Sequence, residues 1–459
     1  MDIKIIESLV AIVGEDNVTD ALIDLVSFSY DSSGLSHRPE VALWVQTTEQ
    51  VAAVLKLANT HKIPVTPRGA GTSLTGSAVP KQGGIVMDMS RMNKILAISV
   101  EDRQVMVQPG VVFDDLNHTL ADTGFFLPPN PASGKVATIG GNVATNAGGV
   151  KGAKYGTTRD YVLDLEVVLA DGSILHTGAK TMKCVSGYDL TRLFVGSEGT
   201  LGVVTEISLK IDPLPKASVT CTATFESLPQ AGKAVGAIMR SGIIPSVLEL
   251  MDSPSLQAVN KATDLDLPEV AAMLLVETDG YTQHDVDWQM EAIIEALDNN
   301  GAIKIAKAST LEEAEKLWAA RKAIYGVITR LNYNVLAEDI VVPISKVADM
   351  LEAITAMSAR SGIMIATVAH AGDGNIHPQF VYDGTNPEEV KKVKQVEAEL
   401  YKLAIELGGT LTGEHGVGMS KAGYMNLEHD PVFMKVMNGL KAFFDPNAIL
   451  NPGKLGLDV

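Results

Sequence analysis

Two short segments in the second half of the chain carry histidines among small residues. They read HAGDGNIH (370–377) and GEHGVG (413–418). Asp373-Gly374 stands between two apolar runs, which is a strong signal for a two-residue β-hairpin turn. Such a turn places His370 directly opposite His377, and opposed residues share one face of the hairpin, with Cβ atoms about 4.5–5.5 Å apart. The spacing therefore predicts two imidazoles that could bind one metal ion.

The second segment places a carboxylate beside a third histidine, Glu414 followed by His415. Glu414 supplies the next ligand for the pair at 370 and 377. Two imidazoles and one carboxylate suit Zn²⁺, Mn²⁺ or Fe²⁺, and the residue types do not choose among them. The alternative is a solvated hairpin that carries two unrelated histidines.

Arg321 lies in a segment with helical periodicity, residues 311–331. Leu317, Arg321 and Ile324 fall on one face of that helix. Two capping boxes could start it, Ser309 with Glu312 or Thr310 with Glu313. An arginine on an apolar stripe either extends its head to solvent or clamps a carboxylate through its planar fork. We expect the clamp, because guanidinium geometry matches a carboxylate in two places.

Glycine-rich segments dominate the first half of the chain. They are residues 68–76, 131–156 with seven glycines in 26 positions, and 196–202. Small residues let the backbone approach a ligand, and successive amides can form a nest for phosphate oxygens. The Rossmann pattern fails at Leu74 and the Walker pattern fails at Val136. Simple turns are the alternative, but three such segments indicate a long phosphate-bearing cofactor held by several loops.

Composition limits the class of protein. The chain has 459 residues, 46% of them hydrophobic, and a formal net charge of −18. Disorder over most of the length is excluded, and the acidic balance argues against a nucleic-acid partner. Two cysteines are too few for a disulfide framework or a four-thiolate iron–sulfur cluster. Neither a signal peptide nor an apolar run of about 18 residues is found, so we expect a cytoplasmic protein without a transmembrane segment.

The elements that position these residues fall into three parts. Residues 1–215 contain an N-terminal helix (2–13), a βα unit (40–62) and several strands (84–112), and they end at Asp212-Pro213-Leu214-Pro215. In residues 216–420, strands alternate with longer helices, including 387–409, as in an α+β domain. Residues 421–459 contain a helix and a tail rich in proline and asparagine.

Four glycine-rich or neighbouring stretches together resemble a known family. PVTPRGAGTSLTGSAVP, PPNPASGKVATIGGNVATNAGG, YGTTRDYVLDLEVVLADG and LFVGSEGTLGVVTEI are similar to the FAD-binding domain of the vanillyl-alcohol-oxidase-type flavoproteins. With the two histidine motifs and the ending DPNAILNPGK, the chain resembles the branch of D-lactate dehydrogenases and glycolate oxidase catalytic subunits. The resemblance implies an α+β fold: a two-part FAD-binding domain of the VAO/PCMH type plus an α+β substrate or cap domain with an antiparallel sheet.

The resemblance also implies which residues bind FAD. They are Pro67, Arg68, Gly69, Ala70, Gly71, Thr72, Ser73, Leu74 and Gly76 in the first loop; Pro129, Ser133, Thr138, Gly141, Asn142, Thr145, Asn146, Gly148, Gly149 and Tyr155 in the second segment; and Glu198, Gly199, Gly202, Val204 and Asn451. Members with covalent flavin carry a histidine in the first loop. Thr72 stands at that place, so we expect non-covalent FAD.

By the same resemblance, His370, His377 and Glu414 bind the divalent metal, and His415 is the catalytic base. Arg321, in the context LWAARK, and Asn375 contact the substrate together with His415. Oxidation of a 2-hydroxy acid removes a hydroxyl proton and a Cα hydride, and the flavin takes the hydride. A metal lowers the hydroxyl pKa, and a histidine near neutrality accepts the proton.

Substrate and electron acceptor follow from smaller signals. Relatives that oxidise D-2-hydroxyglutarate carry a lysine where this chain has Ala337, and residues 335–340 contain no cation. We therefore expect D-lactate, oxidised to pyruvate, with glycolate or D-2-hydroxyglutarate as alternatives. The acceptor is expected to be an electron-transfer flavoprotein, an iron–sulfur subunit, a quinone or oxygen. A non-catalytic flavin-binding relay subunit, and a metallohydrolase with a nucleotide-sensing domain, are the competing hypotheses.

Overall fold

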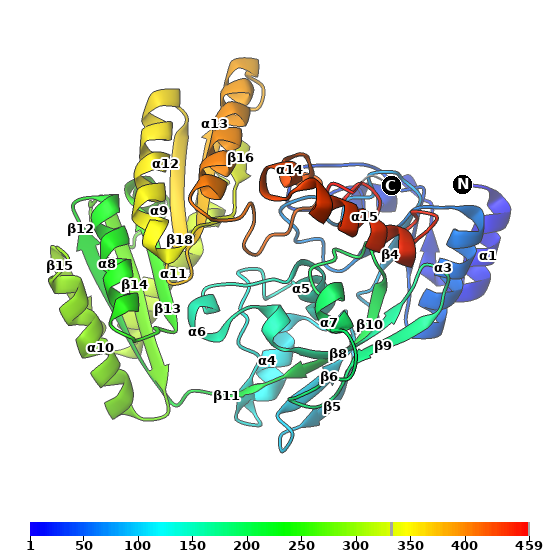
Figure 1. Cartoon of the computed structure of the whole chain (residues 1–459), viewed down its shortest axis with the longest axis horizontal. Coiled ribbons are helices and arrows are strands. Elements are labelled where there is room, and N and C mark those ends of the chain that lie inside the picture. The colour runs from blue at the N-terminus through cyan, green and yellow to red at the C-terminus, as the bar shows by residue number, and fades with distance from the viewer. Residues whose placement is uncertain (331–333, 458–459) are drawn as a thin grey trace. The chain divides into compact units, whose positions relative to one another are not determined.

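The computed structural model describes residues 1–330 and 334–457. The chain forms two compact units (Figure 1). The first unit consists of residues 1–148, 157–214 and 414–459, and the second of residues 149–156 and 215–413. Residues 414–420, which the sequence-based division assigns to the second domain, thus lie in the first unit, while the short segment 149–156 lies in the second.

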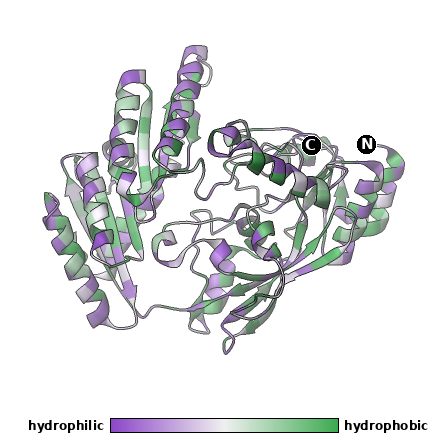
Figure 2. Ribbon diagram, in the orientation of Figure 1, coloured by the Kyte–Doolittle hydropathy of each residue, from purple (hydrophilic) through white to green (hydrophobic). Residues whose placement is uncertain are grey.

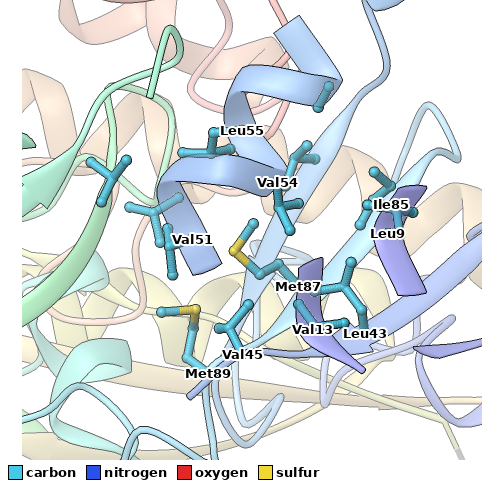
Figure 3. Packing of buried hydrophobic residues seen from close by; sticks show 14 of the residues in the cluster. Leu9, Val13, Leu43, Val45, Val51, Val54, Leu55, Ile85, Met87 and Met89 are labelled. Carbon is cyan, nitrogen blue, oxygen red and sulfur yellow. The ribbon is translucent and has the colours of Figure 1, made fainter. Parts of the chain in front are cut away.

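The first unit begins with a four-stranded sheet of order β1-β2-β4-β3. Its elements are α1 (Ile3–Val13), η1 (Glu15–Asn17), β1 (Val18–Thr19), α2 (Leu22–Ser27), β2 (Val41–Trp44), α3 (Thr48–His61), β3 (Val65–Arg68) and β4 (Ile85–Asp88). The three strands β2, β4 and β3 are parallel, as the βα unit at 40–62 predicts. Met87 packs between α1 and α3 in a core that is closed to solvent (Figure 3).

A second, antiparallel sheet in this unit has the order β5-β6-β10-β8-β9. The elements are β5 (Ile95–Ser99), β6 (Gln104–Val107), α4 (Phe113–Ala121), β7 (Phe125–Phe126), α5 (Ile139–Thr145), η2 (Thr158–Asp160), β8 (Val162–Val168), β9 (Ile174–Gly178), α7 (Leu190–Phe194), β10 (Val203–Lys210) and β11 (Asp212–Pro213). The Asp-Gly turn at 171–172 joins β8 to β9, with Gly172 at φ 86°. Asp212-Pro213 does form a short strand, paired with β7, and the unit ends one residue later.

The last part of the chain returns to the first unit. It contains η4 (Ala422–Tyr424), α14 (Met425–Glu428) and α15 (Pro431–Phe444), and Leu450 pairs with Val65 beside β3. The Lys441 ammonium is 1% exposed and donates to Asp445, to the carbonyl of Thr200 at 2.9 Å and to that of Leu450 at 2.7 Å. A buried charge needs such partners, so this lysine fixes the tail.

The second unit is built on one antiparallel sheet of eight strands, of order β15-β12-β14-β13-β18-β19-β16 with β17 also paired to β19. The strands are β12 (Ala217–Phe225), β13 (Val247–Asp252), β14 (Ala272–Gly280), β15 (Lys304–Lys307), β16 (Asn334–Ala337), β17 (Ile340–Val341), β18 (Met364–His370) and β19 (Asn375–Tyr382). An α+β chain with an antiparallel sheet in its second part was the expectation, and it is confirmed.

Helices cover both faces of this sheet. They are α6 (Gly152–Tyr155), α8 (Leu228–Arg240), α9 (Ser253–Ala262), α10 (Gln283–Asp298), α11 (Leu311–Ile328), η3 (Ile344–Lys346), α12 (Val347–Ser361) and α13 (Pro387–Glu406). Figure 2 shows largely hydrophobic strands beneath helices that alternate between hydrophilic and hydrophobic residues, as amphipathic helices do. The predicted helix at 311–331 ends at Ile328, and Leu331 lies outside the described residues.

The hairpin register differs from the prediction. His370 pairs with Asn375, and Val368 pairs with His377, so the loop has four residues (371–374) instead of two. The reason is a neighbouring strand end: the carbonyl of Leu248 accepts from the amides of Ala371 at 2.8 Å and Gly372 at 3.3 Å. These amides are therefore unavailable for the ladder, and β18 stops at His370.

None of the helices in the described part of the chain is long and apolar enough to cross a membrane.

Candidate active site

His370 and His377 lie on the same face of the large sheet, as diagonal neighbours on β18 and β19. Their ring centroids are 5.0 Å apart, and both side chains are almost fully buried. The prediction that they share a face is thus confirmed, although the predicted direct pairing is wrong. Diagonal neighbours in an antiparallel pair are still within reach of long side chains.

Each imidazole is oriented through its Nδ1 atom. Nδ1 of His370 lies 2.5 Å from Oε1 of Glu249, and Nδ1 of His377 lies 3.3 Å from the carbonyl oxygen of Glu338. A carboxylate or carbonyl on one ring nitrogen is the usual support of a histidine that binds metal through the other. These contacts favour Nε2 as the ligand atom of both residues.

Glu249 joins the histidine to the predicted substrate arginine. Its side chain is fully buried, and its Oε2 accepts from Nε of Arg321 at 2.6 Å. Burial alone would raise the pKa of Glu249, but the charges of His370 and Arg321 outweigh it and hold that pKa below its usual value. One carboxylate therefore fixes both a predicted metal ligand and a predicted substrate-binding group.

Arg321 comes from α11, which packs on the same face of the sheet as α9. The helix starts at Thr310, whose hydroxyl accepts from the Glu313 amide at 3.2 Å, so the second of the two predicted starts is used. The capping box itself is not formed, because the Glu313 carboxylate accepts from the Ser309 amide at 2.6 Å and not from the Thr310 amide. The Arg321 side chain is 13% exposed, so it does not extend to solvent. Within the described residues its two Nη atoms donate no hydrogen bond, and they remain available to a carboxylate ligand.

Asp339 is a second organising carboxylate. Its Oδ1 accepts from the Asn375 side-chain amide at 2.7 Å, and its Oδ2 accepts from the Thr412 hydroxyl at 2.6 Å and the Gly413 amide at 3.0 Å. The side chain is fully buried. Asp339 thus orients Asn375, a predicted substrate contact, and anchors the residues that directly precede Glu414.

The short segment 149–156 is fixed to the second unit at two places. Asp279 on β14 accepts from the Tyr155 hydroxyl at 2.9 Å and pairs with Lys154. A Cβ atom on Gly152 would lie 2.5 Å from Oδ2 of Asp373, in the turn between the two histidines. Gly149 and Tyr155, which were predicted to bind FAD, lie in this segment and so belong to the second unit.

In the first unit, the loop after β3 has the properties of a phosphate nest. Among the residues that the structure describes, none of the six backbone amides from Gly69 to Leu74 donates a hydrogen bond to the protein. Gly71 has φ 69°, a left-handed conformation that glycine adopts without strain. Consecutive amides without protein acceptors are what phosphate oxygens require.

Other predicted cofactor residues surround this loop. A Cβ on Gly69 would meet the hydroxyl of Thr138 at the start of α5, and a Cβ on Gly199 would lie 2.6 Å from Pro67. Asn451 donates to the carbonyls of Ser77 at 2.9 Å and Glu198 at 2.7 Å. Its own side-chain oxygen is buried without a hydrogen-bond partner in the described part of the chain, as expected next to a polar ligand.

Three other predicted FAD residues, Arg68, Asn146 and Gly202, lie in different surroundings. Arg68 is buried, which lowers its pKa, and Nη1 donates to the Ala78 carbonyl at 3.4 Å. Asn146 ends α5 at φ 54° and accepts from the Arg159 amide at 2.8 Å. Gly202 packs against Val167 and Phe194 in the core.

Glu414 and His415 belong to the first unit. His415 Nε2 is 3.8 Å from Oε1 of Glu414, and both side chains are 16% exposed. A Cβ on Gly148 would lie 2.9 Å from Oε2 of Glu414, so the glycine makes room for this carboxylate. The histidine pair belongs to the second unit, and convergence of all four groups on one ion stays a prediction.

Sequence reasoning missed Glu249, Asp339, Asp279 and Ser77. Glu249 interrupts the apolar part of VLELMD, Asp279 lies near the polar end of AMLLVETDG, and both are buried. For Glu249, an acidic residue within an apolar run is the signal that could have found it, because a buried carboxylate needs a charged or polar partner.

Comparisons with known proteins agree with this arrangement. Residues 39–178 match the model of an FAD binding domain, and residues 214–455 match that of the FAD linked oxidases, C-terminal domain. The chain is 42% identical over 456 residues to the glycolate oxidase subunit GlcD of Bacillus subtilis, covering 99% of this chain and 96% of the relative. It is 39% identical over 441 residues to a D-lactate dehydrogenase of Anaerostipes hadrus, covering 93% and 92%.

Among solved structures, p-cresol methylhydroxylase with bound substrate superposes with a TM-score of 0.83 over 99% of this chain and 96% of that chain, at 22% identity. This likeness concerns the fold, which is the predicted VAO/PCMH-type arrangement. The family matches together span most of the sequence. The chain therefore belongs to the FAD-linked oxidases, in the family of glycolate oxidase GlcD subunits and D-lactate dehydrogenases.

Proposed function

We propose that the protein oxidises a small D-2-hydroxy monocarboxylic acid, with D-lactate as the first candidate substrate and pyruvate as the product. The observation that carries the proposal is the chain His370–Glu249–Arg321. It ties a predicted metal ligand and a predicted carboxylate clamp to one buried acid. Such a linked pair suits a substrate whose hydroxyl and carboxylate are on adjacent carbons.

The first unit supplies a fitting site for FAD. The amides of residues 69–74 would take the pyrophosphate oxygens, and the buried oxygen of Asn451 would accept a hydrogen bond from the cofactor. When bound, FAD accepts the hydride that leaves Cα of the substrate. Thr72 stands where members with covalent flavin carry a histidine, and this supports non-covalent binding of FAD.

His370, His377 and Glu414 would hold a divalent metal such as Zn²⁺, Mn²⁺ or Fe²⁺. The two histidines are already oriented by Glu249 and the carbonyl of Glu338. The Gly413 amide is anchored on Asp339, and Glu414 is the next residue in the chain. A metal at this place would lower the pKa of the substrate hydroxyl.

The chain's own groups would then perform three tasks. His415 would accept the hydroxyl proton at an imidazole nitrogen, since histidine titrates near neutral pH. Arg321, held through Nε by Glu249, would bind the substrate carboxylate with its Nη atoms. Asn375, fixed by Asp339, would contact the substrate beside the metal. Binding at two points determines which face of Cα meets the cofactor.

The size of the substrate is inferred from residues 335–340. Ala337 pairs with Gln379 on β19, and the described side chains of this stretch include no cation that could bind a second carboxylate. This favours D-lactate or glycolate over D-2-hydroxyglutarate. Glycolate is the second candidate, because the relative with 42% identity is a glycolate oxidase subunit.

The electrons must pass to a separate acceptor. The relative from Bacillus subtilis is named as a subunit, which supports a protein partner such as an electron-transfer flavoprotein or an iron–sulfur subunit. A quinone is the alternative. A non-catalytic relay subunit would have no use for the supported histidine pair.

The test is anaerobic stopped-flow mixing of the purified full chain with D-lactate, L-lactate, glycolate and D-2-hydroxyglutarate. We expect the oxidised flavin absorbance to bleach with D-lactate or glycolate, and the rate to fall after treatment with a chelator and return with Zn²⁺ or Mn²⁺. Absence of bleaching with every acid would refute oxidation by this chain. Full activity in protein free of divalent metal would remove the metal from the proposal.

A further inference from the structure

Glu198 has an unusual backbone for a glutamate. Its φ is 51°, in the left-handed region that non-glycine residues rarely adopt, and its side chain is 3% exposed. A residue persists in such a conformation only when its surroundings hold it there. Family resemblance assigns Glu198 to the FAD site, but its contacts indicate a different role.

Both carboxylate oxygens of Glu198 are used by protein donors. Oε2 accepts from the Ser77 hydroxyl at 2.6 Å and from the Gly418 amide at 2.9 Å. Oε1 accepts from the Val417 amide at 2.7 Å and from the Gly418 amide at 3.1 Å. Ser77 follows the glycine-rich loop, whereas Val417 and Gly418 follow His415. This carboxylate therefore joins two segments that are more than three hundred residues apart in sequence.

Thr75 makes a second connection between the same segments. Its hydroxyl donates to the carbonyl oxygen of His415 at 3.2 Å, and its own carbonyl accepts from the amides of Met419 at 2.8 Å and Ser420 at 3.1 Å. On the other side, Asn451 donates to the carbonyls of Ser77 and Glu198. The backbone around His415 is thus attached to the loop at Thr75 and, through Glu198, at Ser77.

Tight packing leaves little freedom in this connection. A Cβ on Gly416 would lie 2.8 Å from Oε1 of Glu198, and Gly418 has φ 50°. The two glycines let the chain pass close to the carboxylate and point successive amides at it. A shift of the glycine-rich loop would therefore be transmitted to the backbone of His415.

We propose that Glu198 is a positioning residue for His415. It locks the segment 415–420 to the loop predicted to wrap the FAD pyrophosphate, so that the loop that holds the cofactor also sets the place of the base. The inference deepens the proposed function and rests on it for the role of His415. The coupling of the two segments is independent of that role and can be measured separately.

The test uses two variants of the full-length chain. E198Q keeps the shape but replaces one acceptor oxygen with an NH₂ group, which cannot accept from the amides of Val417 and Gly418. T75V removes the hydroxyl that donates to the His415 carbonyl, and with it the contact to the Ser77 hydroxyl at 3.1 Å, but leaves the Glu198 carboxylate in place. E101Q, at an exposed carboxylate in the same unit, is the matched control.

Hydrogen exchange gives the first readout. In the wild-type chain and E101Q, adding FAD to the apoprotein should slow exchange of the amides at 417–420 about tenfold or more, because ordering the loop orders the attached segment. In E198Q and T75V this protection should shrink while protection of residues 69–74 remains. Equal protection of 417–420 in all four proteins would overturn the proposal.

Flavin reduction gives the second readout. With D-lactate or glycolate, E198Q and T75V should keep FAD and a similar KM but reduce the flavin about tenfold or more slowly, as expected for a misplaced base. Wild-type rates in both variants would overturn the positioning role, and loss of FAD from both would make the pair part of the cofactor site instead. If no acid reduces wild-type flavin, the proposed function fails, whereas the exchange experiment still decides the coupling.

Discussion

Nδ1 of His370 lies 2.5 Å from a carboxylate oxygen of Glu249, and the Glu249 side chain is fully buried. The ring nitrogen must donate, because an ionised carboxylate only accepts. That fixes the tautomer and leaves Nε2 as the nitrogen that a metal would bind. Metal binding by His370 can therefore be tested by changing Glu249 and measuring metal affinity, without an assay of turnover.

Replacing Glu249 with glutamine should weaken metal binding. E249Q removes the negative charge that makes the imidazole of His370 more basic, so we expect the affinity for Zn²⁺ or Mn²⁺ to fall about 10- to 100-fold while FAD remains bound. Metal titration against a competing chelator, on protein checked for folding by circular dichroism, measures this. E388Q, at an exposed acid on α13, is the control. Equal affinities would contradict support of His370 by Glu249.

Replacing Arg321 with lysine tests the carboxylate clamp. R321K keeps the charge but loses the planar fork, so we expect KM for the hydroxy acid to rise about tenfold or more, from the loss of one charge-assisted hydrogen bond. Steady-state kinetics with an artificial electron acceptor measure it. Lys322 is the exposed neighbour on the same helix, and K322A should leave KM unchanged. An unaltered KM in R321K would exclude the clamp.

Removal of the His415 imidazole should separate chemistry from cofactor binding. H415A has no group to accept the hydroxyl proton, so we expect flavin reduction to slow by about 10²- to 10⁴-fold with FAD content unchanged. Stopped-flow absorbance gives the rate and the flavin-to-protein ratio gives the content. H284A, on the exposed surface of α10, should behave as wild type. Reduction at the normal rate in H415A would mean that another group is the base.

A methyl group added at Gly152 should disturb the hairpin that carries His370 and His377. The Cβ of G152A would lie 2.5 Å from Oδ2 of Asp373, so this carboxylate, in the turn between His370 and His377, must move. We expect about tenfold weaker metal binding, in the range found when support of metal ligands is disturbed. G439A, on α15 with nothing within 4 Å, is the control. Metal affinity that is the same in both variants would contradict the prediction.

Asp252 should make stability depend on pH. Burial raises its pKa from 3.8 to about 6, although Ser255 and Thr367 donate to it. The folded state therefore favours the protonated acid. The contribution of Asp252 to the free energy of unfolding is fully present below pH 3.8 and is lost as the pH rises through about 6. The difference corresponds to about 3 kcal/mol.

D252N cannot ionise, so its free energy of unfolding should lack this decline. Urea unfolding at several pH values between 4 and 7, compared with wild type and with D264N at an exposed acid, measures the difference. If wild type and D252N have parallel pH profiles, the raised pKa is not real. Other titrating groups cancel in the comparison, because both proteins share them.

Local patterns predicted the elements well where the signal is contained in a few neighbouring residues. The helix start at Thr310, the Asp-Gly turn at 171–172 and the helix at 3–13 depend on contacts within one turn of the chain. The hairpin register failed because its loop length depends on the carbonyl of Leu248, which is more than a hundred residues away. Nothing near residue 371 reveals that partner.

The candidate site was predictable as a set of residues but not as a network. Residue types and family resemblance identified the histidines, Arg321 and Asn375. Glu249, which holds His370 and Arg321, is placed by the pairing of β13 with β18, and Asp339, which holds Asn375, follows β16, which pairs with β19. Buried carboxylates on otherwise apolar strands are informative only once their partners are known. That knowledge comes from tertiary structure.

The return of the tail to the first unit has a consequence for biosynthesis. Leu450 pairs with Val65, and Asn451 donates to the carbonyls of Ser77 and Glu198, yet both are translated after all of residues 215–413. The nucleotide-binding half therefore cannot complete its core while the ribosome is still making the other half. The nascent chain must hold an unfinished first unit through that interval, because Val65 and Glu198 wait for partners that are made only after the second unit.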